Sequence, residues 1–147
     1  MITPVVIFWF RRDLRIADNR GLSEALKSGY PVQPLFIFDT NILNDLEDKQ
    51  DRRVEFIHQA LQSIQQSLGL SGATLDVRIG DPLDLFKTLL SEYKVKAVYA
   101  NHDYEPYALK RDLEIADFLK LNHIEFESYK DCFLFSLVFS LSMILFN

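Results

Sequence analysis

Short apolar runs alternate with segments of helical periodicity along most of this chain. The first run, residues 5–10, contains only β-branched and aromatic residues, which is typical of a strand buried on both faces. Four more strands are expected at residues 32–38, 74–79, 97–100 and 125–128. Between the strands, apolar residues recur at three- and four-residue steps, as they do on the buried side of an amphipathic helix.

Two of the expected helices have clear start signals. Asp18 and Asn19 are candidate N-caps of the first helix, and Asp81 followed by Pro82 opens the third. Residues 40–50 are polar and are expected to be irregular, and the second helix follows from Asp51. The last helix opens at Pro106, and its buried face is expected to consist of Leu109, Leu113, Ala116 and Leu119.

Strands that alternate with helices in this way predict a parallel sheet. Right-handed crossovers place the helices on both faces of such a sheet. The expected fold class is therefore α/β, a Rossmann-like three-layer sandwich with a five-stranded parallel sheet. The chain has 147 residues, which is enough for one domain with a real core.

Charged and polar residues follow three of the expected strands. Arg11, Arg12, Asp13 and Arg15 come after the first strand, Asp39 after the second, and residues 101–105 after the fourth. In an open α/β sheet the carboxyl ends of the strands share one edge, and ligands bind there. We therefore expect these side chains to meet around one ligand.

Composition excludes several kinds of site and partner. The net charge of −5 does not favour a chain that coats nucleic acid by itself. The five glycines form neither a dinucleotide fingerprint nor a P-loop. The three histidines lack the spacing of metal ligands, so no metal site is predicted. No residue is proposed as a nucleophile or general base, and no catalytic residue is assigned.

One cysteine, Cys132, excludes an intrachain disulfide, and no N-terminal run resembles a signal peptide. These two observations favour a reducing, cytoplasmic location.

Two segments carry a resemblance to a known family. Residues 8–15, FWFRRDLR, precede Asp18, Asn19 and Leu22, and the segment NHDYEPY at residues 101–107 is followed by Arg111 and Asp112. This pattern resembles the amino-terminal domain of the DNA photolyase/cryptochrome family, and the resemblance runs from about Val5 to Asp131. It implies an α/β domain that holds a light-harvesting antenna chromophore.

The resemblance also implies a second domain that this chain lacks. In the family, the antenna passes its energy to FAD in a separate helical domain, and FAD then supplies an electron to a pyrimidine dimer in DNA. FAD and DNA would therefore bind only through that missing domain. We expect this chain by itself to be inactive as a deoxyribodipyrimidine photo-lyase, and the photolyase and blue-light signalling branches stay open.

The same resemblance suggests which residues hold the chromophore. In members that bind a deazaflavin, polar contacts come from the positions that match Arg53, Asp103 and Glu105. A flat ring would pack on Ile37 and Phe38, and the expected contacts also include Phe10, Arg11 and Asp39. Members that bind a reduced folate have a carboxylate where this sequence has Tyr107 or Ala108. A flavin or deazaflavin is therefore favoured over a folate.

Other conspicuous residues have structural interpretations. Arg12, Asp13, Arg15 and Asn19 are expected to fix the loop after the first strand and to meet the helical domain. Asp39 has the alternative role of capping a loop or helix. Trp9 is expected in the core. Lys110 and Arg111, with Asp112 and Glu114, are expected to form a solvated helix face.

The chain becomes apolar after residue 131, and residues 132–146 contain no charge. This run is shorter than the ~20 residues that span a membrane, so no membrane segment is expected. We divide the chain into an antenna-type domain, 1–131, and an apolar tail, 132–147. The tail is interpreted as the product of an interrupted reading frame, or alternatively as a helix or strand that covers the sheet. It could also mediate self-association.

Two other functions remain open from the sequence. The chain could be a non-functional gene fragment, or it could be a stand-alone nucleotide-binding α/β protein. The lack of a glycine-rich phosphate loop argues against the second. An absorption spectrum of the purified protein would separate an antenna domain from both.

Overall fold

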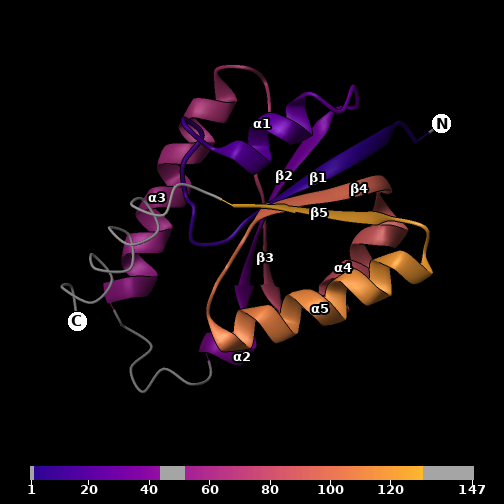
Figure 1. Ribbon diagram of the computed structural model, residues 1–147. Coiled ribbons are helices and arrows are strands. Elements are labelled where there is room, and N and C mark those ends of the chain that lie inside the picture. Colours follow the sequence, from indigo (N-terminus) through magenta and orange to yellow (C-terminus); the bar gives the residue numbers. More distant parts are fainter. Residues whose placement is uncertain (1, 44–51, 131–147) are drawn as a thin grey trace.

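The computed structural model describes residues 2–43 and 52–130, which form a parallel sheet between two helical layers (Figure 1). The strands are β1 (Pro4–Phe10), β2 (Val32–Asp39), β3 (Asp76–Gly80), β4 (Lys94–Asn101) and β5 (Glu125–Tyr129). The helices are α1 (Arg20–Leu26), α2 (Thr40–Leu43), α3 (Arg52–Gly69), α4 (Pro82–Glu92) and α5 (Pro106–Leu121). The expected α/β sandwich with five parallel strands is confirmed.

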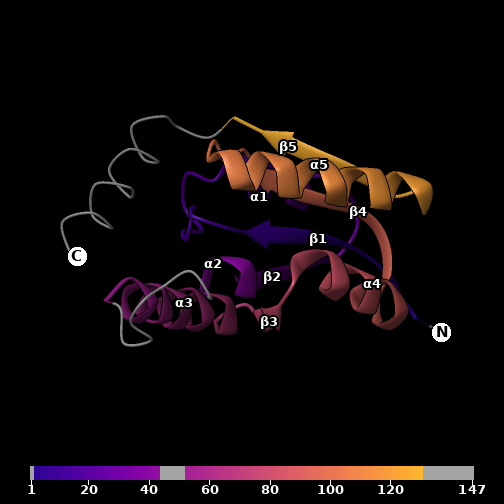
Figure 2. The same ribbon diagram turned by 90° about the horizontal axis from the view of Figure 1, so that it is seen from below.

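The central strand β1 divides the core into two halves, because its side chains alternate between the two faces of the sheet. Ile7 and Trp9 pack toward the side of α4 and α5, while Phe8 and Phe10 pack toward α1 and α3. All four side chains are at most 1% exposed. Figures 1 and 2 show the two helical layers on opposite faces of the sheet. The prediction of a first strand buried on both faces is confirmed.

The strand order β3-β2-β1-β4-β5 creates a switch point between β1 and β4. The chain moves from β1 outward to β3 on one side and then returns to build β4 and β5 on the other. Crossovers on opposite faces leave a crevice at the carboxyl ends of the two strands that flank such a point, and ligands of open α/β sheets bind there. The polar loops that begin at Arg11 and His102 lie at this crevice.

Both predicted helix starts are confirmed. The side chain of Asn19 accepts a hydrogen bond of 3.0 Å from the Leu22 amide and caps α1. Asp81 accepts one of 3.2 Å from the Asp84 amide and caps α4. These short polar side chains satisfy amide groups that have no partner within the first helical turn.

Two expectations about local structure are wrong. The start of the segment expected to be irregular, residues 40–43, forms α2, while residues 44–51 lie outside the described part of the chain. In α5, Leu109 and Leu113 are 50% and 67% exposed. The buried residues of this helix are Ala108, Arg111, Ile115 and Leu119, so of the expected buried face only Leu119 is confirmed as buried. Both sets have helical spacing. The set with Ile115 and Leu119 packs into the core, and the same face places Arg111 beside the carboxylates of Asp39 and Asp103.

The predicted boundary after Asp131 and the apolar tail also lie outside the described residues, so the division into two segments stays a prediction. Across residues 2–43 and 52–130, no helix combines the length and the apolar character needed to span a membrane.

Candidate functional site

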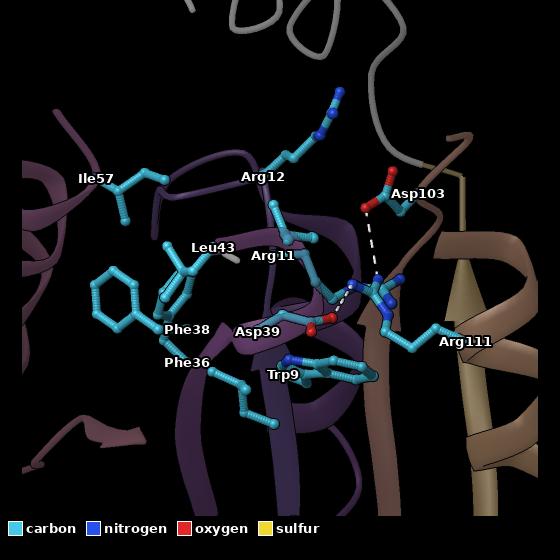
Figure 3. A pocket seen from close by; sticks show the side chains of 12 residues that line it. Trp9, Arg11, Arg12, Phe36, Phe38, Asp39, Leu43, Ile57, Asp103 and Arg111 are labelled. Carbon is cyan, nitrogen blue, oxygen red and sulfur yellow. Dashed lines mark ion pairs between the residues drawn. The ribbon is translucent and has the colours of Figure 1, made fainter. Parts of the chain in front are cut away.

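A pocket of about 150 Å³ lies at the carboxyl ends of β1 and β2 (Figure 3). One side of it is apolar and consists of Phe36, Ile37, Phe38, Ile42, Leu43 and Ile57. The other side is charged and consists of Arg11, Arg12, Asp39, Asp103 and Arg111, next to the ring of Trp9. Segments far apart in the sequence therefore meet at the sheet edge that the strand ends predicted.

The apolar side is built by the end of β2 and the helix that follows it. Phe36 and Phe38 lie on the same face of the strand, with ring centroids 5.0 Å apart in an edge-to-face arrangement. Asp39 then accepts a hydrogen bond of 2.9 Å from the Asn41 amide. This turn starts α2 directly after the strand, and it brings Ile42 and Leu43 over the pocket.

Arg111 is the centre of the charged side, although it comes from α5. Its guanidinium lies 3.7 Å from a carboxylate oxygen of Asp39 and 3.6 Å from one of Asp103. Its Nε donates a hydrogen bond of 3.1 Å to Asp112. The residue is 8% exposed, and its Nη2 forms no hydrogen bond with any residue that the structure describes. Arg111 therefore keeps a buried donor at the pocket.

Asp39 joins Arg111 to the start of α5. The Tyr107 hydroxyl donates a hydrogen bond of 2.6 Å to Asp39 Oδ2. Partial burial and this hydrogen bond raise the pKa of Tyr107 to about 12. Tyr107 therefore stays protonated near neutral pH and remains a donor to the carboxylate. Asp39 therefore caps the turn into α2, and it also lines the pocket. The sequence had suggested these two roles as alternatives.

Trp9 lies next to this charged cluster and also belongs to the hydrophobic core. It is 1% exposed, so its expected position in the core is confirmed. The guanidinium carbon of Arg11 lies 4.8 Å from the centroid of its ring, and that of Arg111 lies 4.9 Å away. Arg11 is held by both oxygens of Asp112, each at 2.7 Å, and it also donates to the backbone carbonyl of Asn101. Each arginine combines contact with the indole and a carboxylate partner.

A second polar cluster lies beside the pocket and is centred on Asn101. Its side-chain Nδ2 donates to Asp13 at 2.5 Å and to Asn19 at 2.7 Å, while its Oδ1 accepts from the Gly21 amide at 2.8 Å. Asp13 also accepts from the Arg11 amide, and Asn19 donates to the carbonyl of Arg15. Burial raises the pKa of the Asp13 carboxyl, against the opposing effect of these hydrogen bonds.

Five of the eight chromophore contacts expected from the sequence line the pocket. They are Arg11, Ile37, Phe38, Asp39 and Asp103.

The other three expected contacts lie elsewhere. Phe10 is fully buried on the face of the sheet covered by α1 and α3. Arg53 is half-buried on α3 and outside the lining. Glu105 is exposed and forms an ion pair of 3.3 Å with Arg12.

Arg111 and Asp112 are the residues whose role the sequence reading missed. They were expected on a solvated helix face, and that expectation is wrong, because the side chains are only 8% and 15% exposed. A signal was present in the helical spacing, since Arg111 follows Ala108 by three residues and precedes Ile115 by four. Within the described residues, no group of three or more His, Cys, Asp or Glu side chains could hold a metal ion.

Known proteins are similar to this chain in both sequence and fold. Deoxyribodipyrimidine photo-lyase of a Synechococcus species is 38% identical over 120 residues, which cover 82% of this chain and 24% of that protein. A photolyase structure from Sulfolobus tokodaii superposes with a TM-score of 0.79 at 36% identity, covering 86% of this chain and 29% of that one. A cryptochrome structure from Synechocystis sp. PCC6803 has the same TM-score at 26% identity, covering 88% and 28%.

This chain spans about a quarter of the length of these relatives. The model of the DNA photolyase family matches residues 6–138, which is most of the sequence. The match begins in β1 and includes all the residues that line the pocket. The chain therefore belongs to the DNA photolyase family.

Proposed function

We propose that the pocket binds one end of a flat, conjugated antenna chromophore, with a flavin or deazaflavin preferred over a reduced folate. In the whole protein, its excitation would pass to FAD in a helical domain that repairs pyrimidine dimers or signals blue light. The observation that carries the proposal is Arg111 Nη2, a buried donor that lies 3.6 Å from Asp103 and forms no hydrogen bond with the described residues, next to the apolar side of the pocket.

The chemistry of the two sides supports such a ligand. The edge of a flavin-type ring carries carbonyl oxygens and a ring N–H, so it needs both donors and acceptors. Arg111 Nη2 would donate to a carbonyl, and the carboxylates of Asp39 and Asp103 would accept from the N–H. Phe36 and Phe38 line the opposite side, where the faces of the ring can pack (Figure 3).

The size of the pocket limits what it would enclose. Its volume of about 150 Å³ is below the ~300–1,000 Å³ that is usual for a site around a drug-sized ligand. We therefore propose that the pocket takes the polar edge of the ring and leaves the ribityl or larger substituents outside. The similar Sulfolobus tokodaii photolyase was solved with two FAD molecules, which implicated a novel light-harvesting cofactor in that protein.

Binding is tested by incubating the purified chain with riboflavin, a 5-deazaflavin or a reduced folate, and then separating it by gel filtration. We expect flavin or deazaflavin absorbance to co-elute with the protein, and less folate absorbance than either. If none of the three is retained, and equilibrium dialysis at higher ligand concentration also finds no binding, the proposal is wrong for this chain.

The role of Arg111 is tested with Arg111→Lys, because lysine keeps the charge and loses the planar fork. We expect the affinity for the ring to fall about tenfold, since one hydrogen bond from a charged donor is lost. The matched control is Arg78→Lys. Arg78 binds Asp76 at 3.0 Å and also pairs with Glu92 at the edge of the sheet, outside the pocket. This control should leave the affinity unchanged, and an equal loss in both variants would contradict the assignment.

The apolar side is tested with Ile42→Ala, since Ile42 lines the pocket but is 45% exposed and should be tolerated by the fold. We expect weaker binding of the ring and little change in thermal stability. Ile79→Ala removes the same group from an exposed position on β3, where Ile79 is 67% exposed. Ile79→Ala should leave binding unchanged, and equal binding by both variants would argue against a ring at this side.

Energy transfer requires the whole protein. In a full-length photolyase or cryptochrome that carries this domain, light absorbed in the antenna band should drive FAD photochemistry. An action spectrum that lacks the antenna band would show that the bound chromophore does not pass its energy to FAD, and only the binding part of the proposal would stand.

A further inference from the structure

We infer that Arg11 and Arg111 protect an excited chromophore in the pocket from losing its energy to Trp9. This inference rests on the proposed function, because it concerns a ligand in that pocket. It assigns the two arginines a role in the excited state, beyond holding the loop after β1 to α5.

Trp9 is placed where it could quench an excited chromophore in the pocket. Its indole ring lines the pocket, and indole gives up an electron more readily than the other aromatic side chains do. One electron could move from Trp9 into the orbital vacancy of an excited ring and later return. No bond would form or break in this cycle, and nothing would be oxidised overall. The excitation energy would be lost as heat before it reached an acceptor.

The surroundings of Trp9 oppose that electron transfer. The guanidinium carbons of Arg11 and Arg111 lie 4.8 and 4.9 Å from the ring centroid. A cation over an aromatic face is attracted to the neutral ring, but it repels a ring that has lost an electron. Trp9 is also 1% exposed, so water cannot stabilise a positive charge on it. Both effects make Trp9 harder to oxidise.

The carboxylates around the site make Trp9 easier to oxidise, and the size of this effect depends on their distance from the ring. The two guanidinium groups lie over the ring itself, whereas Asp39, Asp103 and Asp112 pair with the guanidinium groups. Coulomb energy falls with distance, and the protection of Trp9 requires that the two cations over the ring outweigh the three carboxylates that pair with them.

The first test uses the chain without a ligand. Trp9 is the only tryptophan of the sequence, so its oxidation can be followed by the absorption of the indole radical without interference from another tryptophan. A photo-generated small oxidant should react several-fold faster with Arg111→Met than with the unaltered chain. Asp103→Asn should react more slowly, because it removes a negative charge. Structural damage would change both rates in the same direction, and that result would contradict the inference.

The second test measures the fluorescence lifetime of bound riboflavin or deazaflavin. The unaltered chain and Trp9→Phe should give nearly equal lifetimes, because Trp9 is already a poor electron donor. Arg111→Met should shorten the lifetime, and Trp9→Phe combined with Arg111→Met should restore it. A lifetime in Trp9→Phe that is several-fold longer than in the unaltered chain would overturn the inference, and this comparison needs no arginine variant to fold.

The two proposals fail in different ways. If no chromophore is retained, the proposed function is wrong, while the oxidation rates of the ligand-free variants still show whether the arginines protect Trp9. If a chromophore binds and its lifetime does not depend on Arg111, the site stands as a binding site and the protective role is wrong.

Discussion

The two polar clusters at the carboxyl edge of the sheet differ in how completely the chain satisfies them. The side chain of Asn101 makes three hydrogen bonds of 2.5 to 2.8 Å, to Asp13, Asn19 and Gly21. Arg111 approaches Asp39 and Asp103 only at 3.7 and 3.6 Å, and its Nη2 makes no hydrogen bond with the described residues.

This difference separates a structural cluster from a candidate binding site. Polar groups that are buried and mutually satisfied fix the conformation of the chain, and they offer a ligand nothing to bind. A buried donor that keeps a free hydrogen-bonding direction is costly without a partner, and a ligand can supply that partner. Charge density alone does not make the distinction, since both clusters are rich in charged and amide groups.

The largest expected effect is on the cluster around Asn101. In Asn101→Ala, the buried Gly21 amide loses its partner, and the partly buried Asp13 carboxylate loses one of its hydrogen bonds. We expect the free energy of unfolding to fall by about 3 kcal/mol, measured by urea denaturation.

The matched control for this variant is Asn122→Ala. Asn122 donates one exposed hydrogen bond of 2.9 Å to the carbonyl of Phe118 at the end of α5. Its loss should cost less than about 1 kcal/mol. Equal costs for the two variants would show that the cluster around Asn101 does not fix the fold.

A smaller effect is expected at Gly21, where α1 packs closely on β4. A Cβ atom at this position would lie 2.8 Å from Asn101 Oδ1 and 2.9 Å from the ring of Phe8. Gly21→Ala should therefore destabilise the fold by about 2 kcal/mol through overpacking. Gly69→Ala is the control, because nothing lies within 4 Å of a Cβ there, and it should be neutral or slightly stabilising. A neutral Gly21→Ala would contradict the close packing at this point.

The next expected effect is a pH dependence that originates at Asp13. Burial raises the pKa of this carboxyl in the folded chain, so the folded state holds the proton more tightly than the unfolded state does. The stabilising contribution of the proton is complete below the ordinary aspartate pKa of about 3.9, and it is lost as pH rises through the folded value. In Asp13→Asn the side chain cannot titrate, so this loss of stability is absent.

The free energy of unfolding of the unaltered chain, minus that of Asp13→Asn, should therefore decrease as pH rises above about 4. Urea denaturation across this range measures the difference. A difference that increases with pH would mean that the hydrogen bonds from the Arg11 amide and Asn101 outweigh burial at this carboxyl.

The sequence predicted the sheet and the edge that holds the pocket, because both follow from local patterns. The apolar run of β1 and the caps at Asn19 and Asp81 depend on neighbouring residues alone. The charged strand ends Arg11 and Asp39 then had to lie on one edge, since parallel strands end on the same side.

What the sequence did not predict depends on how α5 is rotated about its axis. Two stripes on this helix have the same spacing, one with Leu109 and Leu113 and one with Arg111 and Ile115. Apolar content favours the first stripe. The second stripe is buried because Ile115 and Leu119 pack into the core, where Arg111 also lies beside carboxylates from β2 and from the loop after β4, and these partners are distant in the sequence. Short-range periodicity cannot include such partners.

The smallest expected effect concerns Glu105, which the family resemblance assigns to the chromophore. Its side chain is 55% exposed and pairs with Arg12, while Asp103 lines the pocket with a side chain only 10% exposed. Because exposed ion pairs contribute little, Glu105→Gln should change the free energy of unfolding by less than about 0.5 kcal/mol.

The same variant should change the affinity for a flavin-type ring by less than about twofold, whereas Asp103→Asn, the matched removal of one charge, should weaken it about tenfold. Isothermal titration of both variants makes the comparison. Equal losses would mean that the chromophore extends beyond the pocket and reaches Glu105, as the resemblance implies. The polar contacts would then divide between the buried cluster at Arg111 and the exposed rim, and the contrast between satisfied and unsatisfied clusters would no longer locate the whole site.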